Sequence, residues 1–355
     1  MIGGSGFIGT RLVAKLIDSG HDVSIFDLAA SAVFPDRVML GDVRDEVALT
    51  RALGDCDWVI QLAAEHRDDV RPIAKYFDVN VGGAKNIVAV MQRLGINHAI
   101  LMSSVAVYGL KQTLPDEAAS VQPDGPYGES KAQAEAIFRQ WSVASPLLRT
   151  LVVLRPVVVF GEGNRGNMLN LIEQIRRNRF LMVGKGDNYK SAAYVENLVD
   201  FTCLQLHAAA GEHVFNYADK PDRSIREWVT GIDAILGRRA RGSDAVPVSL
   251  GIAVGYVFDA LAWITRRRFA VSSDRVRKFC ADTSVSTQTL EDTGFRARYD
   301  LDTGLKRMIA HLDGKGDEHA VADAALRMPS TSSDRRGQLV PDDNEGIPTT
   351  QHRGH

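Results

Sequence analysis

Short apolar runs alternate with helical patterns through the first half of this chain, and that alternation narrows the possible folds. The runs that we predict to be strands are 22–27, 37–40, 58–62, 98–102 and 150–154. The stretches that we predict to be helices are 9–19, 73–94 and 127–141. Strands that alternate with helices in this way form a parallel sheet with helices on both faces. The sequence therefore predicts an α/β fold with a doubly wound parallel sheet.

A glycine-rich segment, GGSGFIG at residues 3–9, stands at the start of the first predicted helix. Glycines let the backbone approach a dinucleotide pyrophosphate, which then lies at the N-terminus of the helix that begins near Phe7. Ligands of such sheets bind at the carboxyl ends of the strands, where this loop and Ser104 both fall. We therefore expect a Rossmann-like domain over residues 1–160.

Only Met1 and Ile2 precede the glycine loop. A Rossmann unit normally has a buried strand of about five or six residues at this point. We therefore expect the first strand to be truncated, and a truncated or misassigned start is the favoured interpretation. A protein that lacks this strand would bind its cofactor less tightly and be less stable.

The second half of the chain is less regular. Residues 161–312 are predicted to form a smaller substrate-binding cap, and part of 193–216 is predicted to return to the main sheet. Helical patterns in this half cover 168–177, 195–206 and 225–236. Residues 313–355 have no aromatic side chain and are rich in Asp, Gly, Pro, Ser and Thr, so we expect a disordered tail.

The segment YGESK at 127–131 carries the candidate chemistry. Tyr127 and Lys131 share one face of a helix because they are four residues apart. A free phenol has a pKa of about 10, and a neighbouring ammonium favours the phenolate and lowers that pKa. Ser104, 23 residues before Tyr127, would orient the substrate. Together they predict proton transfer at an alcohol or ketone, coupled to hydride transfer with a nicotinamide.

Composition excludes several other classes of protein. The net charge of −2 suggests neither a nucleic acid nor an acidic membrane as partner. Three widely spaced cysteines fit neither a disulfide framework nor a zinc site and indicate a reducing compartment. No histidine pairs with acids at a metal-ligand spacing, so we predict no metal. The start of the chain shows no signal peptide, and we expect a cytoplasmic protein.

An almost wholly apolar segment covers residues 249–264 and is followed by Arg266, Arg267 and Arg268. It is too short to span a bilayer comfortably, and Asp259 and two glycines interrupt it. We favour a buried helix or a lid packed against the substrate site. Peripheral membrane contact through 249–268 is the open alternative.

Taken together, these motifs resemble the extended short-chain dehydrogenase/reductases, in particular the NAD-dependent nucleotide-sugar epimerase/dehydratase family. The resemblance covers about residues 1–312. It rests on GGSGFIG (3–9), FD (26–27), GDVRD (41–45), QLAA (61–64), VNVGGAKN (79–86), SSVAVYG (103–109), PYGESK (126–131), LRPVVVFG (154–161) and YVENLVD (194–200). The set is highly specific for the superfamily and much less specific for the substrate.

The resemblance implies NAD as cofactor. Asp27 would bind the ribose hydroxyls and repel a 2′-phosphate, which favours NAD over NADP. Lys190 stands near an arginine that many relatives use for the substrate diphosphate, with a solvated surface lysine as the alternative. The predicted cofactor-binding residues are Gly3, Gly6, Phe7, Ile8, Gly9, Asp27, Asp42, Val43, Leu62, Ala63, Ala64, Asn80, Tyr127, Lys131 and Pro156. The predicted catalytic residues are Ser104, Tyr127 and Lys131, and the predicted substrate contacts are Ser104 and Lys190.

Departures from the family pattern narrow the reaction. Val105 and Ala106 stand where 4,6-dehydratases carry an Asp-Glu pair, so we do not expect dehydration. Val158 stands where many galactose epimerases carry an asparagine that contacts the sugar, which counts against a simple UDP-glucose epimerase. The leading hypothesis is an NAD-dependent epimerase or oxidoreductase, acting at C4 of a nucleotide-linked, UDP-type sugar in a homodimer. A 4-ketoreductase, a 3β-hydroxysteroid dehydrogenase-like enzyme and a non-catalytic NAD sensor stay open.

Overall fold

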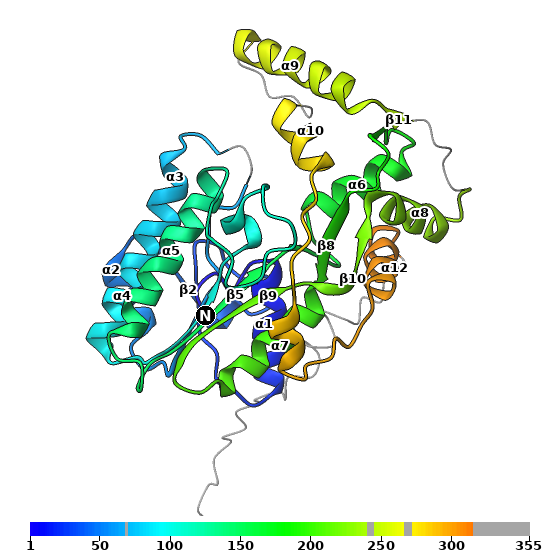
Figure 1. The fold of residues 1–355 in the computed structure, drawn as a ribbon. Helices are drawn as coiled ribbons and strands as arrows, with labels where there is room; N and C mark the ends of the chain where they lie inside the picture. Colours follow the sequence, from blue (N-terminus) through cyan, green and yellow to red (C-terminus); the bar gives the residue numbers. More distant parts are fainter. Residues whose placement is uncertain (68–69, 240–244, 266–271, 315–355) are drawn as a thin grey trace, which may run out of the picture.

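A computed structural model describes residues 1–67, 70–239, 245–265 and 272–314, without the side chains of 262–264. Its main sheet is parallel and confirms the doubly wound α/β fold (Figure 1). The strands, in spatial order, are β2 (Val38–Leu40), β1 (Ile25–Asp27), β3 (Trp58–Gln61), β4 (His98–Met102), β5 (Thr150–Pro156) and β9 (Gly211–Tyr217). As expected, a segment from the second half of the chain, β9, returns to this sheet.

Ile2 occupies the position between β1 and β3, where a full central strand would lie. It makes parallel bridges to Phe26 on one side and Gln61 on the other, and its side chain is fully buried. The Ile2 amide donates to the Ile60 carbonyl at 2.9 Å, and the Leu62 amide donates to the Ile2 carbonyl at 2.9 Å. Two residues therefore join the two halves of the sheet, in agreement with the expected short first strand.

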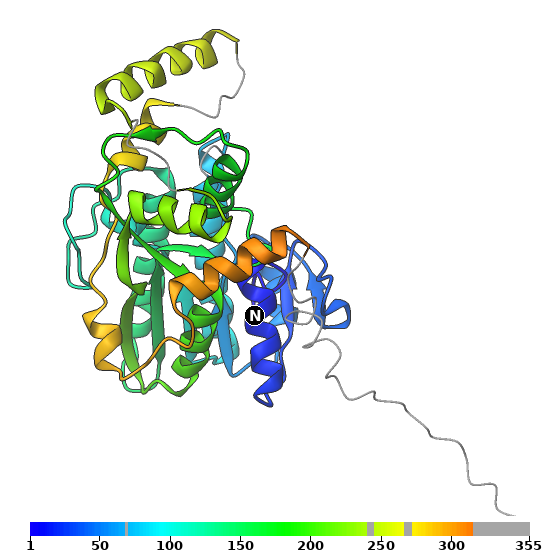
Figure 2. The same ribbon diagram turned by 90° about the vertical axis from the view of Figure 1, so that its right-hand side faces the viewer.

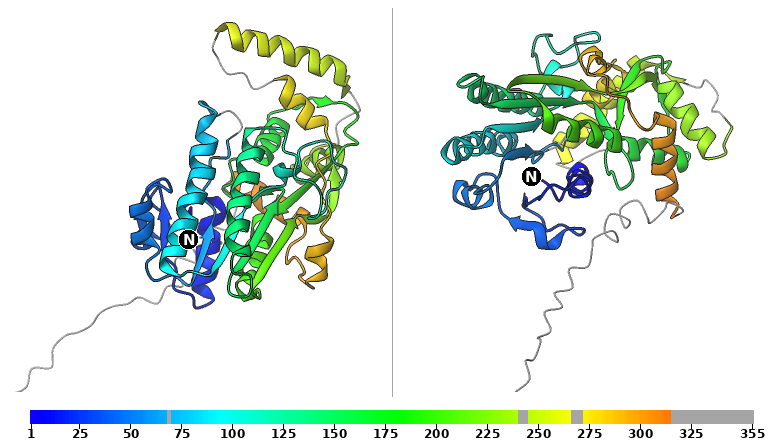
Figure 3. Two further views of the ribbon diagram at one scale, coloured as in Figure 1. Left: turned by 60° about the vertical axis from the view of Figure 1, so that its left-hand side comes forward. Right: turned by 90° about the horizontal axis from the view of Figure 1, so that it is seen from below.

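Helices cover both faces of the sheet (Figure 3). The strand side chains alternate between two apolar cores, so that Ile100 lies in one and its neighbours Ala99 and Leu101 lie in the other. The first core is closed by α1 (Phe7–Asp18) and α7 (Val195–Leu204). The second core is closed by α2 (Glu46–Ala52), α4 (Gly83–Leu94) and α5 (Pro126–Val143). The predicted helix at 73–94 comprises α3 (Ala74–Tyr76), a π-helical stretch (Phe77–Gly82) and α4.

The second half of the chain adds a smaller unit beside the main sheet. Its strands are β6 (Val158–Phe160), β7 (Met182–Val183), β8 (Tyr189–Tyr194), β10 (Asp219–Ser224) and β11 (Ala245–Val246). Its helices include α6 (Asn167–Arg176), α8 (Ile225–Ile235) and α12 (Leu301–Leu312), whereas α11 (Gln288–Asp292) packs against β9 of the main sheet. A capping box between Ser224 and Glu227 fixes the start of α8. Most of the predicted tail lies outside the described residues, which end at Gly314.

Two further helices, α9 (Val248–Thr265) and α10 (Ser273–Cys280), stand at one end of the molecule (Figures 1 and 2). The apolar segment is therefore a helix, as predicted, but the expectation that it is buried is wrong. Large side chains of α9, such as Leu250 and Val257, are more than half exposed. Apolar periodicity cannot tell which element covers a helix, and here α9 packs mainly against α10.

Candidate active site

The glycine loop is tightly packed at the start of α1. Gly3 has a φ of +80°, and a Cβ there would lie 2.5 Å from the Ala63 amide nitrogen. A Cβ on Gly9 would lie 2.5 Å from the Gly3 carbonyl oxygen. Gly6 caps α1 without a side chain, and the first amides of a helix have no partner within it. The amides of Phe7 and Ile8 can therefore bind a phosphate, so this loop fits a dinucleotide pyrophosphate.

Asp27 ends β1 beside this loop. Its carboxylate accepts hydrogen bonds from the Ser5 amide at 2.9 Å and the Ala29 amide at 3.1 Å. These bonds hold the carboxylate at the carboxyl end of β1, while a carboxylate has further lone pairs to accept hydroxyl groups. The position fits the expected contact with a ribose, and the contact itself remains a prediction.

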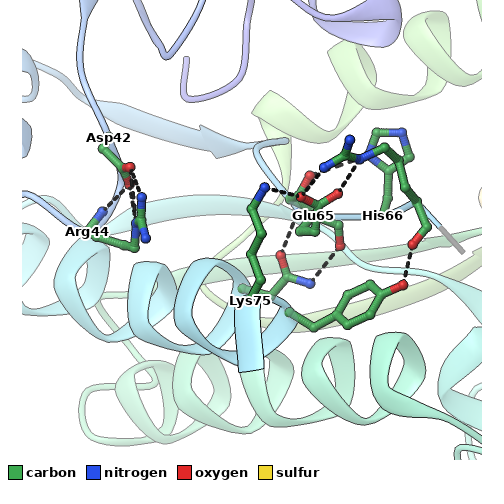
Figure 4. Close-up of polar contacts among 9 residues, drawn as sticks. Asp42, Arg44, Glu65, His66 and Lys75 are labelled. Carbon is green, nitrogen blue, oxygen red and sulfur yellow. Dashed lines mark hydrogen bonds and ion pairs between the residues drawn. The ribbon is translucent and has the colours of Figure 1, made fainter. Parts of the chain in front are cut away.

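Asp42 and Val43 follow β2, on the same edge. Arg44 donates to both carboxylate oxygens of Asp42, and this hydrogen bonding is the main reason that the pKa of Asp42 is lowered. Val43 is buried against Gly83, where an added Cβ would lie 2.8 Å from a Val43 methyl carbon. In Figure 4 the Asp42–Arg44 pair lies apart from the Glu65 cluster. Val43 is thus a buried apolar side chain, and its place beside an adenine remains a prediction.

A buried carboxylate, Glu65, follows the predicted cofactor residues Leu62, Ala63 and Ala64, and sequence reasoning missed it. Arg67 donates to its two oxygens at 2.9 and 2.8 Å, and the Lys75 ammonium lies 3.0 Å from one of them (Figure 4). Hydrogen bonding from Arg67, followed by that from Lys75, lowers the pKa of Glu65 to about 2. The carboxylate is therefore ionised throughout the neutral range.

Asn80 connects this loop to α5. Its side-chain oxygen accepts from the Glu65 amide at 2.8 Å, and its nitrogen donates to the Glu65 carbonyl at 3.0 Å. The same nitrogen donates to the Ser130 hydroxyl at 2.8 Å. Asn80 is almost fully buried, so these bonds fix the chain after β3 against the helix that carries Tyr127 and Lys131. Asn80 therefore joins the chain after β3 to α5, and its contact with the cofactor remains a prediction.

Two of the three predicted catalytic residues, Ser104 and Lys131, lie at the carboxyl end of β4. The Lys131 ammonium is buried and donates to the Met102 carbonyl, the last residue of β4, at 2.7 Å. Ser104 follows two residues later, and its hydroxyl oxygen accepts from the Ala106 amide at 3.2 Å. Tyr127 lies in the first turn of α5, with its ring 6.3 Å from that of Tyr76. Lys131 therefore joins α5 to the end of β4, and the catalytic role of the three residues remains a prediction.

Burial changes the acid strength of Lys131. Loss of hydration lowers the pKa of its ammonium to about 8, and the negative charge of Glu135 opposes this effect. Glu135 lies one turn further along α5, where it accepts from the Ser103 hydroxyl at 2.5 Å. Arg155 on β5 forms a buried fork with Glu135, with N–O distances of 3.0 and 2.6 Å. This buried pair, which sequence reasoning missed, supports the back of the site, and Pro156 follows it at the end of β5.

Lys190 lies in β8, away from the residues just described. Its ammonium donates to the carbonyls of Lys278 at 2.8 Å and Ala281 at 2.6 Å, at the end of α10. Burial lowers its pKa to about 8. The lysine thus holds α10 in this structure, and its contact with a substrate diphosphate remains a prediction.

A parallel sheet, a glycine loop before α1 and a buried lysine at the end of β4 define a Rossmann-type, dinucleotide-binding class of enzymes. The family model described as "NAD dependent epimerase/dehydratase family" matches residues 1–218. The chain belongs to this family, and it is an NAD-dependent enzyme.

Individual relatives agree with this assignment. The chain is 45% identical over 312 residues to the N-acetyl-alpha-D-glucosaminyl-diphospho-ditrans,octacis-undecaprenol 4-epimerase of Escherichia coli O157:H7, covering 88% of this chain and 94% of the relative. It is 32% identical over 338 residues to the UDP-glucose 4-epimerase of Streptococcus mutans, covering 87% and 94%. The crystal structure of the Thermus thermophilus UDP-glucose 4-epimerase complex with NAD is similar in fold, with a TM-score of 0.69, 20% identity, and coverage of 88% and 98%.

Proposed function

We propose that this protein is an NAD-dependent epimerase that inverts C4 of a hexose attached to a diphosphate. The observation that carries the proposal is the buried Lys131, held at the end of β4 beside Ser104 and on the same helix as Tyr127. Relatives at 45% and 32% identity, both aligned along most of the chain, are named 4-epimerases.

The side chains have distinct roles in this proposal. The Lys131 ammonium stabilises the phenolate form of Tyr127, and this phenolate accepts the proton of the C4 hydroxyl and becomes a neutral phenol. Ser104 already accepts a hydrogen bond from the Ala106 amide, which leaves its own O–H to donate to the C4 oxygen. NAD held by the loop of residues 3–9 would supply reversible hydride transfer at C4, with inversion when the hydride returns to the opposite face of the sugar. The hydrogen bonds of Asn80 hold the chain after β3 in place against α5 during the reaction.

The proposal also concerns the carrier, which is the group attached to the sugar through the diphosphate. The Escherichia coli relative is named for an N-acetylglucosamine on diphospho-undecaprenol, and its 45% identity makes a polyprenyl diphosphate our first candidate. A UDP carrier is the second candidate, supported by the UDP-glucose 4-epimerases among the relatives. In both cases the diphosphate joins the sugar to its carrier, so Lys190 would need to leave the α10 carbonyls to bind it. A homodimer through the helices around 75–94 and 127–141 is also proposed.

The test compares two substrates and two variants. Purified protein is incubated with polyprenyl-diphospho-N-acetylglucosamine or UDP-N-acetylglucosamine, and the released sugar is identified by chromatography. Tyr127→Phe is expected to lower kcat by about 10²–10⁴-fold while NAD binding is retained, because only the proton transfer is lost. Tyr189→Phe, which alters an exposed tyrosine on β8, is the matched control and should retain activity.

Two results would contradict the proposal. Full turnover by Tyr127→Phe would exclude the phenol as the acid/base. A wild-type protein that binds NAD but converts neither substrate would exclude C4 epimerisation of these sugars.

A further inference from the structure

The exposed face of α9 is an apolar surface without charge. Five of its large side chains are each between 40% and 60% exposed: Leu250, Val254, Tyr256, Val257 and Leu261. Four of these are spaced at i, i+4, i+7 and i+11, which places them along one side of the helix. The 18 residues of α9 include a single charged residue, Asp259. An apolar stripe of this size on a helix requires a partner other than water.

The opposite face of α9 packs against α10. Gly255 allows the close approach, because a Cβ there would lie 2.6 Å from the Ser273 backbone, and a Cβ on Gly251 would lie 2.8 Å from a methyl carbon of Val183 on β7. Asp259 turns the same way, because its carboxylate accepts from the Ser273 amide at 3.1 Å. The helix thus directs Asp259 toward α10, while Leu250, Val254, Val257 and Leu261 remain exposed on the other side.

The base of this hairpin is firmly attached to the cap. The Lys190 ammonium bonds to carbonyls at the end of α10, and the Asn188 side chain donates to the carbonyls of Phe279 at 2.8 Å and Ala281 at 3.1 Å. The Tyr189 amide donates to Asp282 at 2.6 Å. These bonds join α10 to the start of β8. The exposed face of α9 is therefore held in a set orientation relative to the catalytic half of the molecule.

Positive charge lies beside the apolar face, on α10. Arg266, Arg267 and Arg268 follow α9 in the sequence and lie outside the described residues. On α10 the exposed Arg277 lies with its guanidinium carbon 5.4 Å from the centre of the Tyr256 ring, beside the apolar stripe. An apolar helix face with an exposed arginine beside it is complementary to an anionic bilayer surface. Two copies of this chain joined through α9 would instead bring their arginine groups together, which costs energy.

The position of α9 suits a membrane-borne substrate. In Figure 1 the strands of the main sheet run toward the end of the molecule on which α9 and α10 lie. The carboxyl end of β4, with Lys131 and Ser104, therefore faces that end. In the described residues no helix is long and apolar enough to cross a membrane. Because one face of α9 packs against α10, the other face would lie on a bilayer surface.

We propose that α9 and α10 form a membrane-docking hairpin, in which the apolar face of α9 enters the surface of an anionic lipid bilayer. The inference rests on the proposed function with a polyprenyl carrier, because such a substrate keeps its lipid chain in the bilayer. Docking through α9 brings the catalytic end of the protein to the level of the sugar diphosphate at the lipid surface.

The first experiment measures binding of the full chain to vesicles by flotation. Wild-type protein is expected to bind vesicles of phosphatidylglycerol and phosphatidylethanolamine, and to bind less to phosphatidylcholine alone. The double variant Val254→Glu/Val257→Glu should weaken binding to the anionic vesicles at least tenfold. The matched control, Leu147→Glu/Leu148→Glu, changes two exposed leucines far from α9 in the sequence and should bind like the wild type.

Folding and self-association are checked on the same proteins. The double variant should keep the wild-type thermal shift on addition of NAD, which shows that the cofactor domain is intact. The membrane proposal is overturned if wild type does not bind anionic vesicles, or if the double variant binds them equally well. It is also overturned if wild type forms a dimer in solution that the double variant loses, since α9 would then contact a second copy.

Epimerisation rates distinguish the membrane-docking proposal from the proposed enzymatic function. With a water-soluble, short-chain prenyl-diphospho sugar, the double variant is expected to match the wild type. With the long-chain substrate in vesicles, its rate should fall at least tenfold. If no sugar is converted by any form, the proposed function fails, whereas vesicle binding still tests the hairpin.

Discussion

At the scale of single residues, Gly9 shows how little space the cofactor loop leaves. An alanine Cβ there would approach the Gly3 carbonyl oxygen to 2.5 Å and the Gly4 Cα to 2.7 Å, and both are backbone atoms that cannot rotate away. The start of α1 would have to move away from the loop. Because the same backbone is expected to bind the pyrophosphate, stability and NAD affinity should change together.

We therefore predict that Gly9→Ala weakens NAD binding at least tenfold and lowers the free energy of unfolding by about 1–3 kcal/mol. NADH fluorescence titration and denaturant unfolding measure the two effects. Gly54→Ala is the control, because a Cβ there has its nearest neighbour at 3.8 Å. Wild-type NAD affinity in Gly9→Ala would show that the loop does not contact the cofactor as proposed.

Glu65 provides a pH-dependent test at the same scale. Its pKa is lowered from 4.5 to about 2 by Arg67 and Lys75, so its ionised form stabilises the folded protein above pH 4.5. That contribution is lost as pH falls from 4.5 to 2. We expect Glu65→Gln to lower the free energy of unfolding by about 1–3 kcal/mol at pH 7, with a discount because the Arg67 side chain is largely exposed.

Unfolding in urea at pH 7 and pH 3 measures the difference in the free energy of unfolding between the wild type and Glu65→Gln. This difference should be smaller at pH 3. Glu46→Gln removes an exposed carboxylate paired with Arg93 and is the matched control, with a smaller expected effect. A Glu65→Gln effect of equal size at both pH values would mean that its ion pairs do not stabilise the fold.

At the scale of elements, β5 and α5 are joined behind the site by Arg155 and Glu135. Both side chains are almost fully buried. Removal of one member of such a pair leaves an uncompensated charge in the core, which costs about 3–5 kcal/mol. The Ser103 hydroxyl, next to Ser104, shares the Glu135 carboxylate, so the position of β4 depends on the same contact.

We predict that Arg155→Leu lowers the free energy of unfolding by about 3–5 kcal/mol, whereas Arg155→Leu/Glu135→Leu recovers part of the loss because no lone charge remains. Arg93→Leu, which breaks a surface pair with Glu46, should cost at most about 1 kcal/mol. Denaturant unfolding of the four proteins measures these values. Equal costs for Arg155→Leu and Arg93→Leu would show that the buried pair is not important for stability.

Local sequence patterns predict that a strand exists better than they predict the residues at which it begins and ends. The strand at 98–102 was predicted to the residue, since it lies between β3 and β5 and has a partner on each side. The strand predicted at 22–27 covers only Ile25–Asp27, because its neighbours Ile2 and β2 supply partners for these residues alone. A strand extends as far as its partners do, and an apolar run does not report their length.

At the scale of the whole molecule, the exposure of α9 depends on which elements pack against it. Its apolar pattern suggested a buried helix, yet its neighbour α10 covers one face and leaves the other exposed. If the hairpin docks on a bilayer, it fixes the orientation of the cap and the catalytic domain relative to the membrane surface. The site then faces the lipid headgroups and a polyprenyl-linked sugar needs no extraction.

The order and spacing of motifs along the chain were enough to predict the parallel sheet, the family and NAD, because each depends on short segments with their own geometry. The partners of Glu65, the Arg155–Glu135 pair, the attachment of Lys190 to α10 and the exposure of α9 depend on residues distant in sequence. Such contacts arise only when the elements pack, because a local pattern shows which face of an element is apolar and not what will cover it.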